Sequence, residues 1–140
     1  MRLRIIIASI LAVIIIAFAV ALQSPKDIRI IDAATSKGIS DKLKPVSITN
    51  VFPAGTAVVN CWFRWNNAKP NTSITASWHY VTDDIHILDY AFDIPRKAGA
   101  GGVSLAMPTG KDLPAGQYRV DLKKGKRLLQ SLTFRVLESS

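Results

Sequence analysis

The chain has 140 residues, of which 49% are hydrophobic, and its 18 basic residues outnumber its 10 acidic residues to give a net charge of +8. Its single cysteine, Cys61, excludes an intrachain disulfide, so stability must come from a hydrophobic core. The residues after position 22 are enough for one such core and too few for two.

An apolar segment runs from Ile5 to Leu22, interrupted only by Ser9, directly behind Arg2 and Arg4. Basic residues ahead of such a segment stay on the cytoplasmic side of a membrane. The pattern therefore predicts an N-terminal hydrophobic helix over residues 1–22 and an extracytoplasmic location for everything after it.

Two interpretations of this segment remain open. Ala19-Val20-Ala21 fits the small-x-small cleavage site of a signal peptide, which would leave a periplasmic or secreted protein. Uncleaved, the segment would be a signal anchor of a single-pass membrane protein whose C-terminal domain lies outside. A helix over Ile5–Leu22 rises about 27 Å, slightly less than the ~30 Å hydrocarbon core of a bilayer.

The rest of the chain predicts an all-β protein. Short runs rich in Val, Ile, Thr and aromatic residues alternate with clusters of Gly, Pro, Asn and Asp. We expect residues 23–45 to form a linker and a first edge strand, and residues 46–140 to form a two-sheet sandwich of seven or eight strands. The glycine-rich stretch 95–102 is expected to be the longest connection. The predicted strands are 27–32, 46–52, 57–65, 73–81, 85–94, 102–107, 116–123 and 127–137.

Two of the predicted strands show clear alternation of apolar side chains, which indicates one face buried in a core. These inward positions are Val59, Cys61, Phe63 and Trp65 in one strand and Ile74, Ala76, Trp78 and Tyr80 in the next.

Three of these features together resemble a known fold. Cys61 and then Trp78 lie on successive predicted strands, and Tyr118 stands near the start of a later one, within Leu113–Val120. The pattern is similar to the immunoglobulin-like and fibronectin type III-like sandwiches of bacterial extracytoplasmic modules, with Val120 where an antibody domain has its second cysteine.

The resemblance implies that Trp78 packs against Cys61 between the sheets. It also implies that the hydroxyl of Tyr118 bonds to backbone near Asp112, in a tyrosine corner. A fold shared at this level carries no function, which has to come from particular sites.

The most concentrated charge is the cluster Lys123, Lys124, Lys126 and Arg127. The part of the chain after the apolar segment carries a net charge of +6, which favours anionic lipid or polysaccharide as a partner. Export makes nucleic acid an unsuitable partner. The alternative is that these residues form an ordinary solvated hairpin tip whose lysines prevent edge pairing.

Trp62 and Arg64 alternate with Cys61 and would therefore point away from the core. An exposed tryptophan beside a cation is typical of a contact surface, for instance for an envelope protein. The alternative is that this strand is central and covered on both sides.

His79 and His86 are the only histidines, and a tight turn at Asp83-Asp84 would place them on one face. They suggest an alternative function, a metal-handling periplasmic protein, but zinc sites usually take at least three protein ligands. The sequence has no phosphate-binding glycine loop, no G-x-S-x-G and no H-E-x-x-H. We therefore expect no enzyme and no cofactor, but a binding or scaffolding module of the cell envelope.

Overall fold

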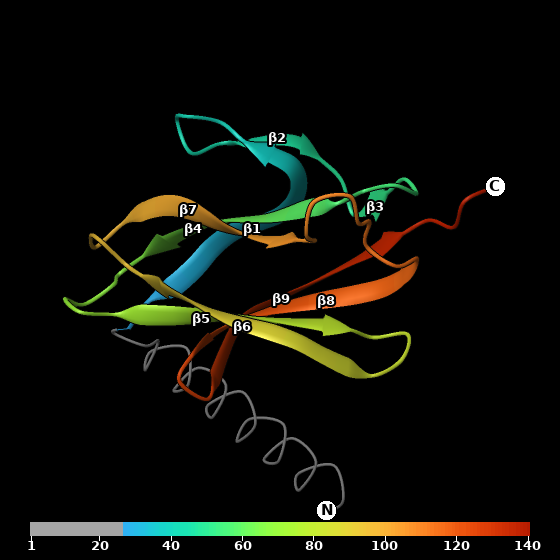
Figure 1. The fold of residues 1–140 in the computed structure, drawn as a ribbon. Helices are drawn as coiled ribbons and strands as arrows, with labels where there is room; N and C mark the ends of the chain where they lie inside the picture. The colour runs from blue at the N-terminus through green and yellow to red at the C-terminus, as the bar shows by residue number, and fades with distance from the viewer. Residues whose placement is uncertain (1–26) are drawn as a thin grey trace, which may run out of the picture.

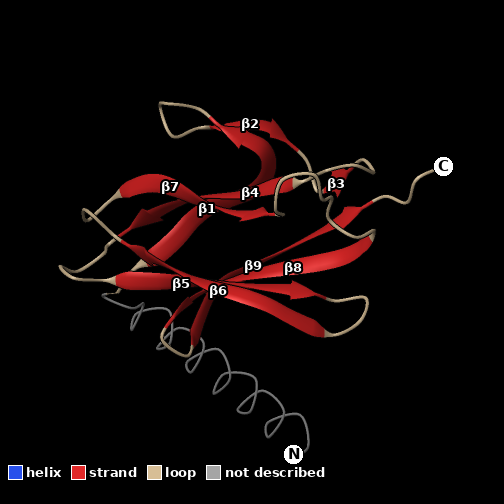
Figure 2. Cartoon of the chain, in the orientation of Figure 1, coloured by secondary structure: helices blue, strands red, loops and turns tan. Residues whose placement is uncertain are grey.

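The computed structural model describes residues 27–140, which form nine β-strands in two facing sheets (Figures 1 and 2). The strand order of the four-stranded sheet is β2 (Pro45–Ile48), β1 (Arg29–Ile39), β4 (Val58–Asn66) and β7 (Gly99–Ala106). That of the five-stranded sheet is β3 (Val51–Phe52), β9 (Arg127–Val136), β8 (Gly116–Lys124), β5 (Ser73–Tyr80) and β6 (Ile85–Asp93). All neighbours are antiparallel except β3, which runs parallel to β9. The prediction of an all-β, two-sheet sandwich is confirmed.

The alternation in β4 and β5 faces the core as predicted. Cys61 and Trp78 are both fully buried, on facing sheets. The ring of Trp78 meets the ring of Phe134 on β9 edge to face, with 6.2 Å between the ring centroids. Phe52 of β3 meets the same Phe134 ring edge to face at 5.6 Å. All three rings belong to the five-stranded sheet and form part of its inner, buried face.

Tyr118 forms the expected corner. Its side chain is buried, and its hydroxyl donates to the backbone carbonyl of Pro114. This acceptor lies two residues after Asp112, near which the bond was predicted. The hydroxyl of Tyr80 donates to the next carbonyl, that of Ala115. Burial raises the pKa of Tyr118 to about 12, so this donor keeps its proton. Two tyrosines thus hold the connection that leads into β8.

The first third of the sandwich differs from the prediction. The first strand extends to Ile39 and lies between β2 and β4, so it is an inner strand and the expectation of an edge strand is wrong. The predicted strand 46–52 is two strands, β2 and β3, which belong to different sheets. The chain leaves the first sheet after Ile48 and reaches the second at Val51, which pairs with Arg135.

The glycine-rich stretch 95–102 was predicted to be the longest connection, but its residues Gly99 to Gly102 are part of strand β7. A Cβ on Gly101 would lie 2.8 Å from Phe92 Cζ, and one on Gly102 would lie 2.1 Å from Ile39 Cδ1. Large side chains from β6 of the facing sheet and from β1 therefore lie directly on this backbone. The glycines are needed for close packing within a strand and do not form a loop.

The predicted hydrophobic helix over residues 1–22 lies outside the described residues. Within residues 27–140, no helix has the length and apolar character needed to cross a bilayer.

The role of the β7 glycines gives a first prediction. Replacing Gly101 with alanine should lower the free energy of unfolding by about 1–3 kcal/mol, because the new methyl group collides with the Phe92 ring. The matched control is Gly38→Ala, where the added Cβ would meet Val46 Cβ at an ordinary 3.8 Å. Urea unfolding should show the control unchanged or more stable by up to about 1 kcal/mol. Equal effects of both substitutions would contradict the packing role of Gly101.

Candidate functional site

The four basic residues predicted as a binding cluster lie together at the tip of the β8–β9 hairpin. Two of them contact the first described residue of the chain. Lys124 Nζ lies 2.6 Å from Asp27 Oδ1, and Arg127 Nη1 lies 3.6 Å from Asp27 Oδ2. Arg127 also donates to the carbonyl of Ile28 at 3.1 Å. The hydrogen bond from Lys124 lowers the pKa of Asp27, so the carboxylate stays charged and the clamp persists at neutral pH.

Asp27 therefore belongs to the site, although the sequence pattern does not single it out. Its carbonyl accepts a hydrogen bond from Asn67 Nδ2 at 3.1 Å, which brings the β4–β5 connection to the same place. No signal in the sequence connects residues 27, 67 and 124, because the pairing depends on how the strands end.

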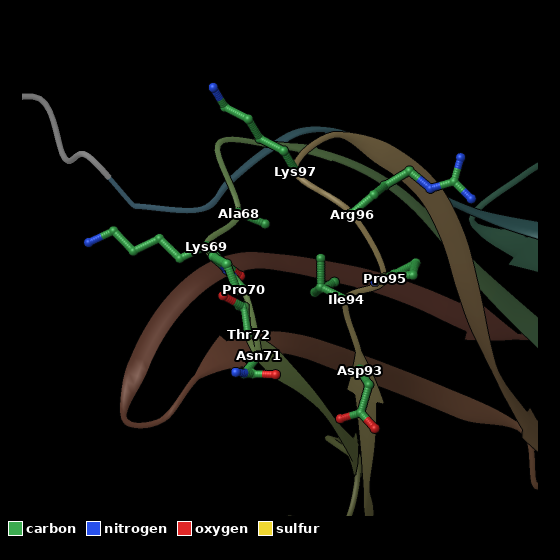
Figure 3. A pocket seen from close by; sticks show the side chains of 10 residues that line it. All are labelled: Ala68, Lys69, Pro70, Asn71, Thr72, Asp93, Ile94, Pro95, Arg96 and Lys97. Atoms are coloured by element: carbon green, nitrogen blue, oxygen red, sulfur yellow. Dashed lines mark hydrogen bonds between the residues drawn. The ribbon is translucent and has the colours of Figure 1, made fainter.

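Two loops stand at this end of the sandwich and form a cavity of about 790 Å³ between residues 68–72 and 93–97 (Figure 3). Backbone hydrogen bonds join the loops, from Ala68 N to the carbonyl of Lys97 and from Ile94 N to the carbonyl of Thr72, both at 2.9 Å. Figure 3 shows the side chains of Lys69, Arg96 and Lys97 fanning outward in different directions. They do not converge on an anion in the cavity, and they present three positive charges to the surroundings.

The loops and the hairpin tip together make one strongly basic surface, which we call the basic end. Asp27 and Asp93 are the acidic residues among these segments. The opposite end of the sandwich has Asp83 and Asp84 in the β5–β6 turn. Positive charge is therefore concentrated where the chain enters the fold. The basic end comprises Lys69, Arg96, Lys97, Lys123, Lys124, Lys126 and Arg127.

Trp62 and Arg64 do not join this surface. They lie on β4, in the middle of the other sheet. Trp62 is only 8% exposed, and its indole N–H donates to the carbonyl of Leu43 at 2.8 Å. The expectation of an exposed tryptophan is wrong, because the β1–β2 connection covers this part of the sheet. Arg64 is exposed.

His79 and His86 are brought together as predicted, with ring centroids 5.1 Å apart on the outer face of the five-stranded sheet. Each has a nearby carboxylate, Asp121 at 3.8 Å from His79 and Asp89 at 2.8 Å from His86. Even so, no group of three or more His, Cys, Asp or Glu side chains within residues 27–140 has an arrangement that could hold a metal ion.

The same face holds a serine, a histidine and an aspartate. Ser77 Oγ lies 3.2 Å from His79 Nε2, and Asp121 approaches that same nitrogen. In a catalytic triad the carboxylate binds the other imidazole nitrogen and orients the ring toward the serine. Asp121 is instead engaged by Ser131 Oγ at 2.7 Å and by Arg119 Nε at 3.2 Å. The group is a structural hydrogen-bond network and lacks the geometry of a proton relay.

The architecture and these sites define an immunoglobulin-like β-sandwich with a basic end. An immunoglobulin-like protein from Pseudomonas aeruginosa has a similar structure, with a TM-score of 0.56 and 14% identity over 79% of this chain and 96% of that protein. This likeness confirms the immunoglobulin-like fold and, at such low identity, shows the fold alone.

An alkylpurine DNA glycosylase from Pseudomonas fluorescens, bound to DNA containing an abasic site analog, matches with a TM-score of 0.49 and 14% identity. That match covers 80% of this chain and 31% of the glycosylase, and it is too weak to carry an argument. No protein-family model matches the chain, and no curated protein matches it in sequence.

Burial of Cys61 gives a second prediction. Burial raises the pKa of this thiol to about 12, so the reactive thiolate is not populated at neutral pH. A thiol reagent should leave the folded protein unmodified and react once guanidinium has unfolded it. Reducing agent should not change the midpoint of unfolding. Rapid labelling of the native protein would contradict the burial of Cys61.

His79 gives a third prediction. Burial, and then the charge of Arg119, lower its pKa below the ordinary 6.5. The unfolded chain therefore binds a proton more readily than the folded one, and stability should fall as the pH drops below about 6.5. Urea unfolding at pH 7.5 and pH 5 should show this loss, and His79→Gln should reduce it. An unchanged difference in the variant would show that another group is responsible.

Proposed function

We propose that this protein is a non-enzymatic binding or scaffolding module of the cell envelope, held outside the cytoplasm by the apolar segment Ile5–Leu22. Its basic end is turned toward anionic lipid headgroups. The observation that carries the proposal is the clamp of Lys124 and Arg127 on Asp27, which makes the basic end the place where the chain enters the sandwich.

The length of the tether supports this orientation. Five residue steps separate Leu22 from Asp27, and an extended chain spans roughly 17 Å over that length. If the segment stays uncleaved, the basic end cannot move farther than this from the end of the anchor. Electrostatic attraction decays over about 8 Å at physiological salt, roughly half the length of the extended tether, so the charges act on the surface when the tether is not fully extended.

The contacts at Asp27 also determine which basic residues should contribute most to membrane binding. Asp27 already neutralises part of the charge of Lys124 and Arg127. Lys126 is exposed at the tip, and Lys69, Arg96 and Lys97 are exposed on the two loops. Each basic residue near an anionic membrane contributes about 1 kcal/mol, so four together can orient a tethered domain.

The non-enzymatic part of the proposal rests on the outer face of the five-stranded sheet. Ser77 and Asp121 approach the same nitrogen of His79, so the carboxylate does not hold the other imidazole nitrogen, as it would in a catalytic triad. The basic end is composed mainly of lysine and arginine side chains. Such a surface is suited to adhesion.

A vesicle experiment tests the proposal. Residues 23–140, once circular dichroism shows them folded, should sediment with vesicles containing about one third anionic lipid, and binding should fall as salt rises. Replacing Lys69, Arg96, Lys97 and Lys126 with glutamine should abolish most of the binding.

The matched control also removes four positive charges, but away from the basic end: Lys42, Lys44, Lys111 and Arg135, each to glutamine. This variant should retain binding. Equal losses of binding in both variants would show that only the net charge of the protein matters, and not the basic end. Binding to acidic polysaccharide in preference to vesicles would show that the partner is a polysaccharide and not a lipid surface.

A further inference from the structure

The long edge strand β6 has an unusual combination of exposure and charge. Among residues 27–140 it pairs only with β5, so its other edge is open. Apart from half-buried Phe92, every residue of this strand is exposed. The other sheet edges in the described part of the chain are less suited to pairing. β3 has two residues, β2 has four with a left-handed residue at Ser47, and β7 is rich in glycine.

The backbone groups that face the open edge can be identified. Ile94 N donates to the carbonyl of Thr72, so these two residues form a hydrogen-bonded pair. Because hydrogen-bonded and non-hydrogen-bonded pairs alternate in an antiparallel ladder, Phe92, Tyr90 and Leu88 also bond toward β5. The N–H and C=O groups of Asp89 and Ala91 therefore point to the open edge.

The side chains of β6 are both apolar and acidic. On the side of the core, Leu88 is 38% exposed and Tyr90 is 53% exposed. On the outer side stand Asp89 and Asp93. Natural edge strands are commonly protected by lysine or proline, but the sequence has no lysine or arginine from Val81 to Pro95 and no proline within β6.

We propose that the open edge of β6 takes up an extended, cationic segment of another protein as an additional strand. Backbone hydrogen bonds to Asp89 and Ala91 would supply affinity, as in other cases of strand addition. Aliphatic side chains of the partner would cover Leu88 and Tyr90, and lysine or arginine at alternate positions would lie beside Asp89 and Asp93.

Charge decides between this partner and a second copy of the chain. Pairing β6 with β6 would bring together the carboxylates of both strands and of their turns, including Asp83 and Asp84, without a lysine or arginine on either strand. Like charges on paired strands are destabilising. The proposal is independent of the basic end, because the open edge runs along the side of the sandwich and stays available in a tethered molecule.

The test uses the full-length chain in nanodiscs of zwitterionic lipid, and a fluorescent nine-residue peptide in which lysine and valine alternate. The peptide should bind, measured by fluorescence anisotropy, and a glutamate–valine peptide should not. Ala91→Pro removes an edge N–H without removing a bond to β5, and it should weaken binding at least tenfold. Ala106→Pro makes the same change at the open edge of β7, where Met107 N bonds to Ala57, and should leave binding unchanged.

A second variant keeps the test decisive if Ala91→Pro fails to fold. Replacing Asp89 and Asp93 with lysine should abolish binding of the lysine–valine peptide and allow binding of the glutamate–valine peptide. No binding by the unmodified chain, or equal binding by the two proline variants, would overturn the proposal. The proposal would also be overturned if the chain dimerises and Ala91→Pro abolishes this dimerisation, because the occupant of the edge would then be a second copy of the chain.

Discussion

Aromatic packing along the inner face of the five-stranded sheet is the interaction on which the structure depends, because no intrachain disulfide is available. Tyr118 stacks on Phe134 at 5.0 Å with nearly parallel rings, and Trp78 and Phe52 meet Phe134 edge to face. A buried aromatic side chain removes about 150–250 Å² from water, which corresponds to roughly 4–6 kcal/mol of gross stabilisation. Phe134 therefore links β3, β5, β8 and β9 in one interior.

A second aromatic group explains why the edge strand β6 is partly buried at its C-terminal end and exposed along the rest of its length. Phe92 of β6 packs edge to face against Phe63 of the opposite sheet at 5.3 Å and lies on the bare backbone of Gly101. This contact buries only the end of β6 that leads toward β7. Leu88 and Tyr90, farther along the strand, have no comparable cover in the described structure and remain exposed.

Positive and negative charges also lie on different parts of the sandwich. The clamp on Asp27 joins the entry of the chain to the hairpin tip and to the β4–β5 connection, and most positive charge at the strand ends gathers there. The carboxylates of β6 lie along the side. One small fold thus offers two electrostatically opposite surfaces, and an anionic membrane and a cationic strand would not compete for the same residues.

The sequence by itself determined the fold class, the inward faces of β4 and β5 and the basic hairpin tip, whereas the tyrosine corner was implied by the resemblance to immunoglobulin-like domains. These features depend on local periodicity and turn chemistry, which neighbouring residues carry. Only the tertiary structure decided that Gly99 to Gly102 belong to a strand, that residues 46–52 divide between two sheets, and that Trp62 is covered. Each depends on a side chain or strand distant in sequence, such as Phe92 over Gly101 or Leu43 over Trp62. The clamp between Asp27 and Lys124 is of the same kind, because contacts across 97 residues leave no periodic signal in the chain.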